Sequence, residues 1–561
     1  MDRQERGSLR SMCSVSRCRK KIWLRATVAG TFVVVLFGAS HGRAQDLGTA
    51  PGALNVNVPY TVAVPGAVGA PPFAGAQPAY NAEERGRAFI IAPRISLEET
   101  ATDNVRSTAT GRQSDLITTI APGVFMDGQS TRLKGSLDYS PTVLRHITAT
   151  DQDTVVQNML GNGTFTAVPD LLFFDANASM SQESRSGARG FSNTSEVPSG
   201  DSTQEMAFAG SPYARFHLGD VADSEIRYRL SQAHFSGNTG AFVSPITGQA
   251  LSSLSDATEQ EALASVTTSQ QFSRLQGRLS ADYDTTSYSD TSLNSRREET
   301  SLDLTYPVTQ AISALASGGY ERLTYSQQSQ LNTIGPTYKI GARYARNDQQ
   351  MVEVDYGRHD GENSFSGVAR YALTPVTTIS ATYNKQRVST QQQTLQGLLT
   401  ATPTGPGTAI NSVTGLPTSI INGVQDPNVP LRNDILVSQN AILGITNAVG
   451  RDSYSILFSH VDQTSLLHLS SDTTSNGAVG TWSHQISPSL TSNLSVSYAL
   501  VSPGSSNVGT IAASLGYALT DTLQAGILYN LFLTSGGAAG SFTSGGTTVV
   551  NNLTLSLTKT F

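Results

Sequence analysis

Charged side chains occupy every second position in several short stretches of the sequence. In "DSEIRYRLS" the charges lie at Glu225, Arg227 and Arg229, with apolar residues between them. Since successive side chains of a β-strand point to opposite faces, the three charges would line one face of a strand. A row of mixed charges along a water-filled passage can orient polar solutes or set an ion preference.

Two further stretches show the same spacing. Arg278, Asp282 and Asp284 align in "GRLSADYDTT", and Glu353 and Asp355 align in "MVEVDYG". If these strands cross a membrane, an Arg facing lipid near the midplane would cost about 2–4 kcal/mol, so the charges should face an interior lumen. A purely structural interpretation also fits, in which the charges pair across neighbouring strands. Both interpretations place these side chains inside.

One stretch could serve nucleophilic catalysis. In "HFSGN", His234 and Ser236 share a strand face, and the pair resembles the His and Ser arrangement of outer-membrane phospholipases. Such catalysis needs the base within hydrogen-bond reach of the nucleophile and a third group that orients the base. The stretch opens a Gly-rich loop, where this geometry would be poorly held. The His residues show no metal-ligand spacing and no phosphate-binding glycine motif occurs, so we predict neither a catalytic site, a metal nor a cofactor, and no enzyme activity.

The elements that carry these side chains are predicted to be β-strands. From Phe89 onward, apolar residues recur with a period of two. The stretches "YALTPVTTISATY" (Tyr371–Tyr383) and "YALTDTLQAGILY" (Tyr517–Tyr529) repeat one pattern, which we interpret as strand, tight turn and antiparallel strand. Tyr residues on both sides of such turns suit the boundary between hydrocarbon and water. In the second stretch, one predicted apolar face continues through Leu523, Ala525, Ile527, Tyr529, Leu531 and Leu533.

Short and long connections alternate along the chain. The predicted short turns lie at Asp127-Gly128, Pro169-Asp170, Gly219-Asp220, Arg274-Leu275, Thr309-Gln310, Asn347-Asp348, Thr374-Pro375, Val449-Gly450, Pro488 and Thr520-Asp521. The longest polar stretch between them runs from Val388 to Asn433. Short turns at one end and long loops at the other are typical of an outer-membrane barrel.

The predicted fold is therefore all-β: a transmembrane, antiparallel, up-and-down β-barrel. We expect about 22 strands (range 18–24), with short periplasmic turns and long extracellular loops. Closure follows from physics, because every backbone N–H and C=O in hydrocarbon must be paired and an open sheet has free edges. A soluble β-sandwich is the alternative, but the polar strand faces are too extensive to share one dry interior.

The N-terminal residues have a different composition. Residues 1–44 form a predicted cleaved signal peptide, with a basic stretch before the apolar Ala26–Ser40 and small residues before a cut after Ala44. Residues 45–86 are rich in Pro, Ala and Gly and are predicted to be a flexible periplasmic extension. The barrel is predicted to span 87–561.

Charge and cysteine content narrow the possible partners. The leader holds nine Lys/Arg and two Asp/Glu, so the chain's net charge changes from −6 to about −13 after cleavage, and nucleic acid is not an expected partner. Both cysteines, Cys13 and Cys18, lie in the leader. The exported chain would therefore be stabilised without disulfides.

Two motifs carry a family resemblance. "APRISLEETATDNV" (Ala92–Val105) resembles the opening of the putative β-barrel porin 2 family, with Thr102, Asp103 and Asn104 at the matching positions. The terminal Phe561 resembles the signal read by the outer-membrane barrel-assembly machinery, although Lys559 stands where an aromatic residue is commoner. The resemblance implies an outer-membrane barrel, and related barrels occur beside exopolysaccharide systems.

Three functions remain open at this point. The first is a porin-like channel for passive passage of small polar solutes, located in the cell outer membrane and surrounded by its lipid. The second is a conduit or accessory barrel for exopolysaccharide export. The third is a non-conducting anchor or surface-interaction barrel, which a lumen plugged by Val388–Asn433 or by the N-terminal extension would favour.

Overall fold

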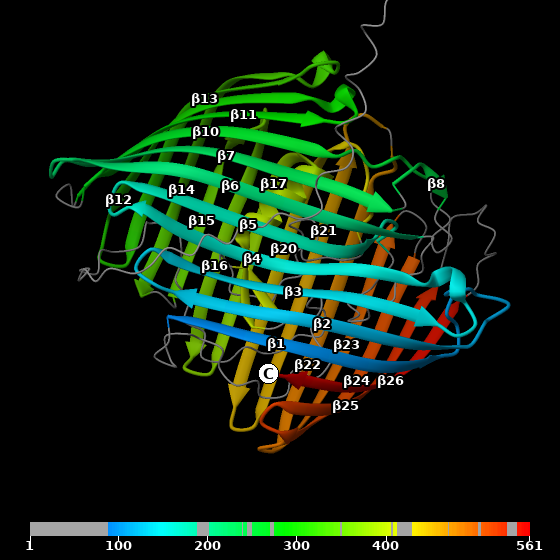
Figure 1. Ribbon diagram of the computed structural model, residues 1–561. Coiled ribbons are helices and arrows are strands. Elements are labelled where there is room, and N and C mark those ends of the chain that lie inside the picture. The colour runs from blue at the N-terminus through cyan, green and yellow to red at the C-terminus, as the bar shows by residue number, and fades with distance from the viewer. Residues whose placement is uncertain are drawn as a thin grey trace, which may run out of the picture. The chain divides into compact units, whose positions relative to one another are not determined.

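The structure is a closed antiparallel barrel of 22 strands (Figure 1). The computed structural model describes residues 88–187, 201–237, 239–243, 250–269, 274–347, 350–405, 408–411, 429–468, 470–502, 506–535 and 547–561. Each strand pairs with the next one along the chain, and β1 pairs with β26 to close the sheet. The predicted fold class and the predicted strand number are both confirmed. The predicted signal peptide (1–44) and the predicted extension (45–86) lie outside the described residues.

The strands of the barrel are β1 (Phe89–Thr102), β2 (Asp115–Gln129), β3 (Leu133–His146), β4 (Thr154–Val168), β5 (Leu172–Ser184), β6 (Ser202–Leu218), β7 (Ala222–Gly237), β10 (Ala257–Thr268), β11 (Gln276–Tyr288), β12 (Ser295–Pro307), β13 (Ile312–Tyr325), β14 (Thr333–Asn347), β15 (Gln350–His359), β16 (Glu362–Thr374), β17 (Thr377–Ser389), β20 (Ile435–Val449), β21 (Asp452–Ser465), β22 (Thr473–Ser487), β23 (Leu490–Ser502), β24 (Ser506–Thr520), β25 (Leu523–Ser535) and β26 (Thr548–Thr560). Shorter elements lie in the connections: the hairpins β8 (Phe242–Val243) with β9 (Ala250–Leu251) and β18 (Ala401–Gly405) with β19 (Thr408–Asn411), the helix α1 (Thr390–Thr400), and the 3-10 turns η1 (Thr150–Gln152), η3 (Thr291–Leu293) and η4 (Ser329–Leu331). Among the described residues, no helix has the length and apolarity needed to span a bilayer.

Both ends of the barrel sequence and the ten short connections lie at one end of the barrel, called here the turn end. Nine of the ten predicted turns lie at the short connections, although four of them include the last residue of the preceding strand: Asn347, Thr374, Val449 and Thr520. The prediction at Asp127-Gly128 was wrong, because both residues belong to β2 and the turn follows at 130–132. Gly128 leaves room for the Phe89 ring, since a Cβ there would lie 2.6 Å from that ring in its present position.

The opposite end, called here the loop end, carries the longer connections. One of them departs from the predicted layout, because only Asp360 and Gly361 separate β15 from β16. Both residues have positive φ, of 55° and 78°. Asp-Gly is a favoured pair for such a tight hairpin turn, which the alternation of short and long breaks did not reveal.

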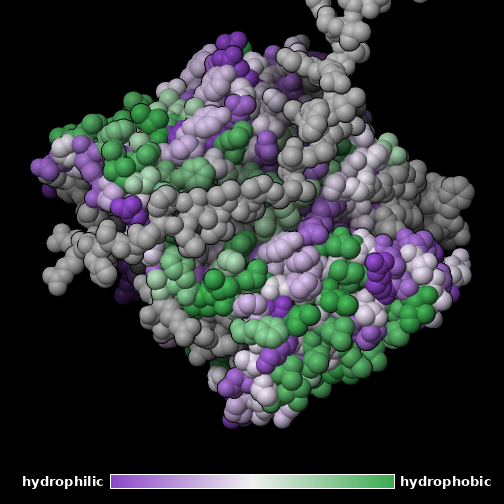
Figure 2. All heavy atoms as spheres, in the orientation of Figure 1, coloured by the Kyte–Doolittle hydropathy of each residue, from purple (hydrophilic) through white to green (hydrophobic). Residues whose placement is uncertain are grey.

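The outer face of the barrel is apolar. Exposed residues alternate with buried ones along β24 and β26, with Ile511, Leu515 and Tyr517 exposed on β24 and Leu553 and Leu555 on β26. Hydrophobic surface spreads over the region of β24–β26 in Figure 2. On β25, Ile527 and Tyr529 of the predicted apolar face are exposed as well, so both strands of the second hairpin present apolar residues outward, as lipid contact requires.

The family-like motif lies where the barrel closes. Asp103 accepts hydrogen bonds from Asn551, at 2.8 Å from the backbone N–H and 2.7 Å from the side-chain amide. Asn104 is fully buried and its amide donates to the carbonyls of Thr108 (2.7 Å) and Val549 (3.2 Å). The motif that Thr102 begins thus joins the first strand to the last at the loop end.

The chain terminus lies at the turn end of the same seam. Phe561 donates its backbone N–H to the Pro93 carbonyl at 2.9 Å, and its ring is 73% exposed. Lys559 donates to Thr522 at 2.6 Å. An exposed terminal aromatic ring is compatible with an assembly signal, which stays a prediction.

Candidate functional site

The connection between β17 and β20 folds against the inner face of the barrel. Its described residues, 390–405, 408–411 and 429–434, are called here the in-folded segment. The segment begins with α1, whose start has a complete capping box. The Ser389 hydroxyl accepts from the Gln392 N–H at 3.1 Å, and the Gln392 side chain accepts from the Ser389 N–H at 3.1 Å. These bonds satisfy two backbone donors and fix the helix directly at the end of β17.

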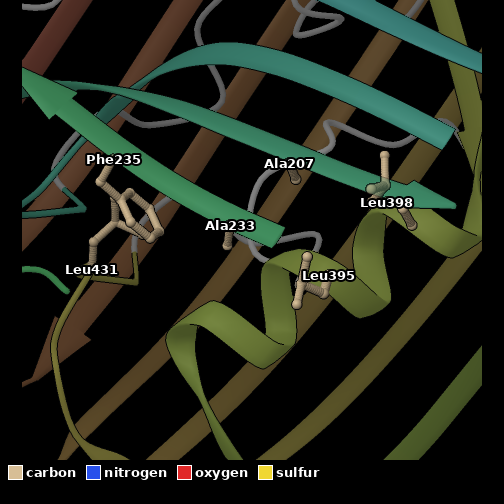
Figure 3. Close-up of a cluster of buried hydrophobic side chains, with 7 residues drawn as sticks. Ala207, Ala233, Phe235, Leu395, Leu398 and Leu431 are labelled. Atoms are coloured by element: carbon tan, nitrogen blue, oxygen red, sulfur yellow. The ribbon is translucent and has the colours of Figure 1, made fainter. Parts of the chain in front are cut away.

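The apolar side of α1 packs on strands far from β17. Leu395 and Leu398 are 1% and 0% exposed and point toward Ala233 on β7 and Ala207 on β6 (Figure 3). Seven strands of the barrel wall separate β7 from β17. Leu395 and Leu398 lie on the inner face of β6 and β7, because Phe208 and Tyr228 on these strands are exposed outside. The helix therefore bridges two parts of the wall through the interior.

Two other described parts of the segment also contact the wall. The β18–β19 hairpin contacts β3 and β4, where Ala401 and Ala409 pack on Leu160. Leu431 returns to the α1 cluster and packs there with Phe235 (Figure 3). Apolar contacts of the β18–β19 hairpin and of Leu431 thus fix the described parts of the segment to the barrel.

Buried amide groups strengthen this attachment. The Gln391 amide donates to the Ser255 carbonyl at 2.9 Å, and Ser255 in turn donates to the Asn433 side chain. Asn433 then donates to Asp290 at 3.2 Å. The start and the end of the in-folded segment are thereby tied to the loops flanking β10 and β11.

Two buried arginines hold the neighbouring loops. Arg185 donates to the carbonyls of Gly240 and Ser252, each at 2.5 Å, and Arg432 donates to Gln463 at 3.0 Å. Burial lowers the pKa of each guanidinium to about 10, so both stay charged at neutral pH. A buried charge tolerates few rearrangements, which favours a single position for the in-folded segment.

The inner face of β10–β13 forms an acidic wall. The alternation of burial places its carboxylates opposite the exposed apolar residues of the same strands. Its members are Glu259, Glu261, Asp282, Asp284, Glu299, Asp303 and Glu321. On these four strands the basic residues on the inner face are Arg278 and Arg297. Carboxylates therefore outnumber cations along this wall.

The predicted charges on β7 lie inside and form ion pairs. Arg227 lies 2.8 Å from Asp175 and 2.9 Å from Glu225, and Glu225 also pairs with Arg215 at 2.9 Å. Arg227 additionally covers the Tyr213 ring at 3.8 Å. Both acids of this cluster are balanced by arginines, so it contributes little net charge.

The remaining predicted charges differ in how far they are compensated. Arg229 pairs with Glu261, while Asp282 lies opposite Glu299 in the sheet register. Asp284 lies between Glu261 and Arg297 in the register.

On β14 and β15 the compensation is more complete. Glu353 pairs with Arg343 at 2.6 Å, and Asp355 lies 3.7 Å from Lys339. Arg278 is exposed on the inner face of β11, opposite Asp303. All eight predicted residues thus share the inner face, and their role in transport stays a prediction.

Three ligand-type residues meet below the short β15–β16 turn. Glu321, His359 and Asp360 bring ligand atoms within 4.8 Å of one another. Their oxygens already have partners, because Glu321 accepts from the N–H groups of Asp360 (3.0 Å) and Gly361 (2.9 Å). Asp360 also pairs with Arg297 at 2.7 Å. The cluster fixes the turn to the acidic wall, and its bonding pattern does not require a metal ion.

The inner face of β20–β26 forms a contrasting hydroxyl wall. Its buried polar residues are Ser438, Asn440, Ser455, Ser459, Gln463, Ser465, Thr473, Ser475, Thr481, Thr491, Ser495, Ser497, Thr510, Ser514, Asn530, Thr534, Thr548, Asn552, Thr554 and Ser556. Hydroxyl groups bond across strands, as Ser497 does with Thr510 at 2.5 Å. Within the described parts of these strands, the inner face carries no charged residue.

His234 and Ser236 lie on the outer face of β7 near the loop end. His234 Nδ1 lies 2.7 Å from Asp256, and the His234 side chain is 52% exposed. Within the described residues, no hydrogen bond joins His234 to Ser236. The arrangement has an orienting acid and a base but no contact between base and nucleophile.

Sequence reasoning did not predict α1. The signal was present, because "STQQQTLQGLLT" combines a Ser N-cap with Gln three positions later and has Leu395 and Leu398 at helical spacing. The two buried carboxyls beneath α1, Glu183 and Glu205, were also missed. Glu205 bonds Thr394 of the helix, a contact that no local pattern indicates.

Neither a family model nor a curated protein sequence matches the chain, so the porin 2 resemblance has no further support. Solved structures of similar fold include the siderophore receptor PiuA from Acinetobacter baumannii (TM-score 0.47, 9% identity, covering 84% of this chain and 82% of that chain). They also include the siderophore receptor PirA from the same organism (0.45, 8%, 84% and 80%). The FrpB iron transporter from Neisseria meningitidis is a third (0.44, 9%, 84% and 81%). At these identities the likeness concerns the outer-membrane barrel fold alone.

Proposed function

We propose that this chain forms an outer-membrane channel through which small polar solutes diffuse, and that its own in-folded segment narrows the passage. The observation that carries the proposal is the contrast between an apolar outer face and a polar inner face in one closed sheet. A barrel of this strand number encloses a lumen too wide for wall side chains alone to fill. Part of that space is taken by α1 and the β18–β19 hairpin.

The acidic wall supports a preference for cations. Carboxylates on a low-dielectric wall attract cations and repel anions, and rings of Asp and Glu are the usual device of cation channels. The ion pairs around Arg227 neutralise one part of the interior, so the preference for cations over anions should be moderate.

Export of a neutral polysaccharide is the second candidate. It is favoured by the hydroxyl wall, where serine, threonine and asparagine side chains offer donors and acceptors without charge.

Reversal-potential measurements in a planar bilayer test the first proposal. With a tenfold KCl gradient across the refolded mature protein, we expect discrete conductance steps and a reversal potential of the sign given by K⁺ preference. A reversal potential of the sign given by Cl⁻ preference would contradict the assigned role of the acidic wall. A conductance blocked by neutral oligosaccharides at low concentration would favour the polysaccharide conduit instead.

A further inference from the structure

The outer face of the barrel carries a basic patch at the loop end of β12–β15. This outer arginine patch consists of Arg296, Arg322 and Arg358, all exposed. Arg322 follows Tyr320 by two positions on β13, and Arg358 follows Tyr356 by two positions on β15. Since residues two apart on a strand share a face, each of these arginines stands beside an exposed outer tyrosine.

Tyrosines form a continuous row below the patch. On β13, Tyr320 lies opposite Pro336 of β14, and Tyr338 follows Pro336 by two positions. Tyr338 in turn lies opposite Arg358 of β15, and Tyr356 precedes Arg358 by two positions. The row therefore steps regularly from β13 to β15. Outward tyrosines of this kind mark the level where hydrocarbon gives way to headgroups. The arginines lie one outward residue beyond that level, about 7 Å farther along the strand.

The patch has surplus positive charge. Arg296 pairs with Glu298 and covers the Tyr283 ring at 4.9 Å. Arg322 lies opposite the same Glu298 in the register. Among the described residues, neither Arg322 nor Arg358 has a carboxylate within ion-pair distance. By contrast, Arg145 on the outer face of β3 at the loop end is compensated by Asp153 at 2.9 Å.

Apolar residues continue below the tyrosine row. Leu302, Ile340, Val354 and Phe365 are 45–61% exposed on the outer faces of β12, β14, β15 and β16. This surface offers contact for acyl chains directly beneath the charged patch. A ligand that fits both parts must carry anionic groups at the headgroup level and hydrocarbon below them.

We propose that the outer arginine patch binds the phosphate groups of an anionic glycolipid in the outer leaflet of the membrane. A planar guanidinium group can donate two parallel hydrogen bonds to two oxygens of one phosphate, whereas a lysine ammonium acts as a point charge. The loop end faces outward, because the short turns and both ends of the barrel lie at the other end. This inference rests on the outer-membrane location in the proposed function, but it does not require conduction.

Binding of defined lipids to the detergent-solubilised protein tests the proposal. The probe is an acylated glucosamine disaccharide with two phosphates, compared with the same glycolipid without phosphates and with phosphatidylglycerol. We expect wild type to prefer the phosphorylated glycolipid and Arg322→Gln/Arg358→Gln to lose about tenfold or more in affinity, as loss of charge-assisted bonds implies. The matched control is Arg346→Gln, which removes an exposed arginine of β14 at the turn end and should bind like wild type.

Three results would overturn the proposal. They are unchanged affinity in the double variant, equal binding of the dephosphorylated glycolipid by wild type, and equal binding of phosphatidylglycerol. Folding of each variant is checked by the difference in gel mobility between heated and unheated barrels. Conductance is measured in parallel, so that loss of lipid binding with normal conductance separates this proposal from that of the channel.

Discussion

The acidic wall on β10–β13 and the hydroxyl wall on β20–β26 face the interior of the same closed sheet and differ in how they are stabilised. The acidic wall is held by ion pairs, in which Arg297 bonds Asp360 at 2.7 Å. The hydroxyl wall is held by neutral hydrogen bonds such as that between Ser497 and Thr510. A buried ion pair is costly to break on one side, whereas a neutral hydrogen bond contributes modestly. The difference teaches that ionic contacts stabilise one side of the barrel and neutral contacts the other, and the proposed cation preference would arise on the ionic side.

Loss of the Arg297 guanidinium should have the largest effect. Arg297→Met leaves Asp360, whose side chain is 6% exposed, without its arginine partner. We expect the free energy of unfolding to fall by about 3–5 kcal/mol, measured by urea titration with folded protein read from gel mobility. Arg278→Met, on an exposed arginine of the same wall, should change stability by less than about 0.5 kcal/mol. Equal effects of the two substitutions would show that the acidic wall is not held by its ion pairs.

The second-largest effect should come from loosening the in-folded segment. Leu398→Ala removes a side chain that is fully buried between α1 and the barrel wall, and core substitutions of this kind cost about 2–5 kcal/mol. We expect faster proteolysis within residues 390–434 while the strands stay protected. The matched control is Gln396→Ala, at an exposed position of the same helix. Identical proteolysis of both variants would mean that the α1 contact does not hold the segment.

A neutral substitution in the hydroxyl wall should have a smaller effect. Thr510→Val keeps the side-chain shape but removes the bond to Ser497, so unfolding should become easier by about 1 kcal/mol. Urea titration under the conditions used for Arg297→Met makes the two walls comparable. A loss as large as that from Arg297→Met would erase the proposed contrast between the walls.

The effect of removing acidic-wall carboxylates on ion selectivity should be the smallest of these effects in free energy. Asp282→Asn/Asp284→Asn removes two carboxylates from the acidic wall and should lower the K⁺ over Cl⁻ permeability ratio about twofold, equivalent to about 0.4 kcal/mol. The ratio is read from reversal potentials. Ser495→Ala, in the hydroxyl wall, should leave it unchanged. A shift of equal size in Ser495→Ala would place the selectivity outside the acidic wall.

The strands could be predicted because alternation is local. The exposed face through Ile511, Leu515 and Tyr517 follows directly from period-two spacing, and the turn after Thr520 follows from its residue types. The same rule placed Arg227 and Asp282 on the inner face. Closure followed from the requirement that membrane-spanning backbone groups be paired.

The parts that sequence reasoning missed depend on contacts between distant residues. That α1 lies inside, against Ala207 and Ala233, depends on packing across the barrel rather than on the helix sequence. The turn at Asp127-Gly128 was misplaced because a strand glycine beside Phe89 resembles a turn glycine. The surplus charge of the outer arginines likewise depends on which neighbours lack a carboxylate. The position of α1 and the surplus outer charge are long-range properties that a local pattern does not encode. The helix itself and the Asp360-Gly361 turn had local signals that were overlooked.

The most direct test of the central claim is single-channel conductance of the refolded protein, compared with a variant in which residues 391–432 are replaced by a short Gly-Ser linker. If the barrel is an open passage narrowed by its own segment, wild type should give discrete steps and the variant larger ones. Silence from both proteins, with gel mobility showing both to be folded, would contradict the account and leave a non-conducting anchor.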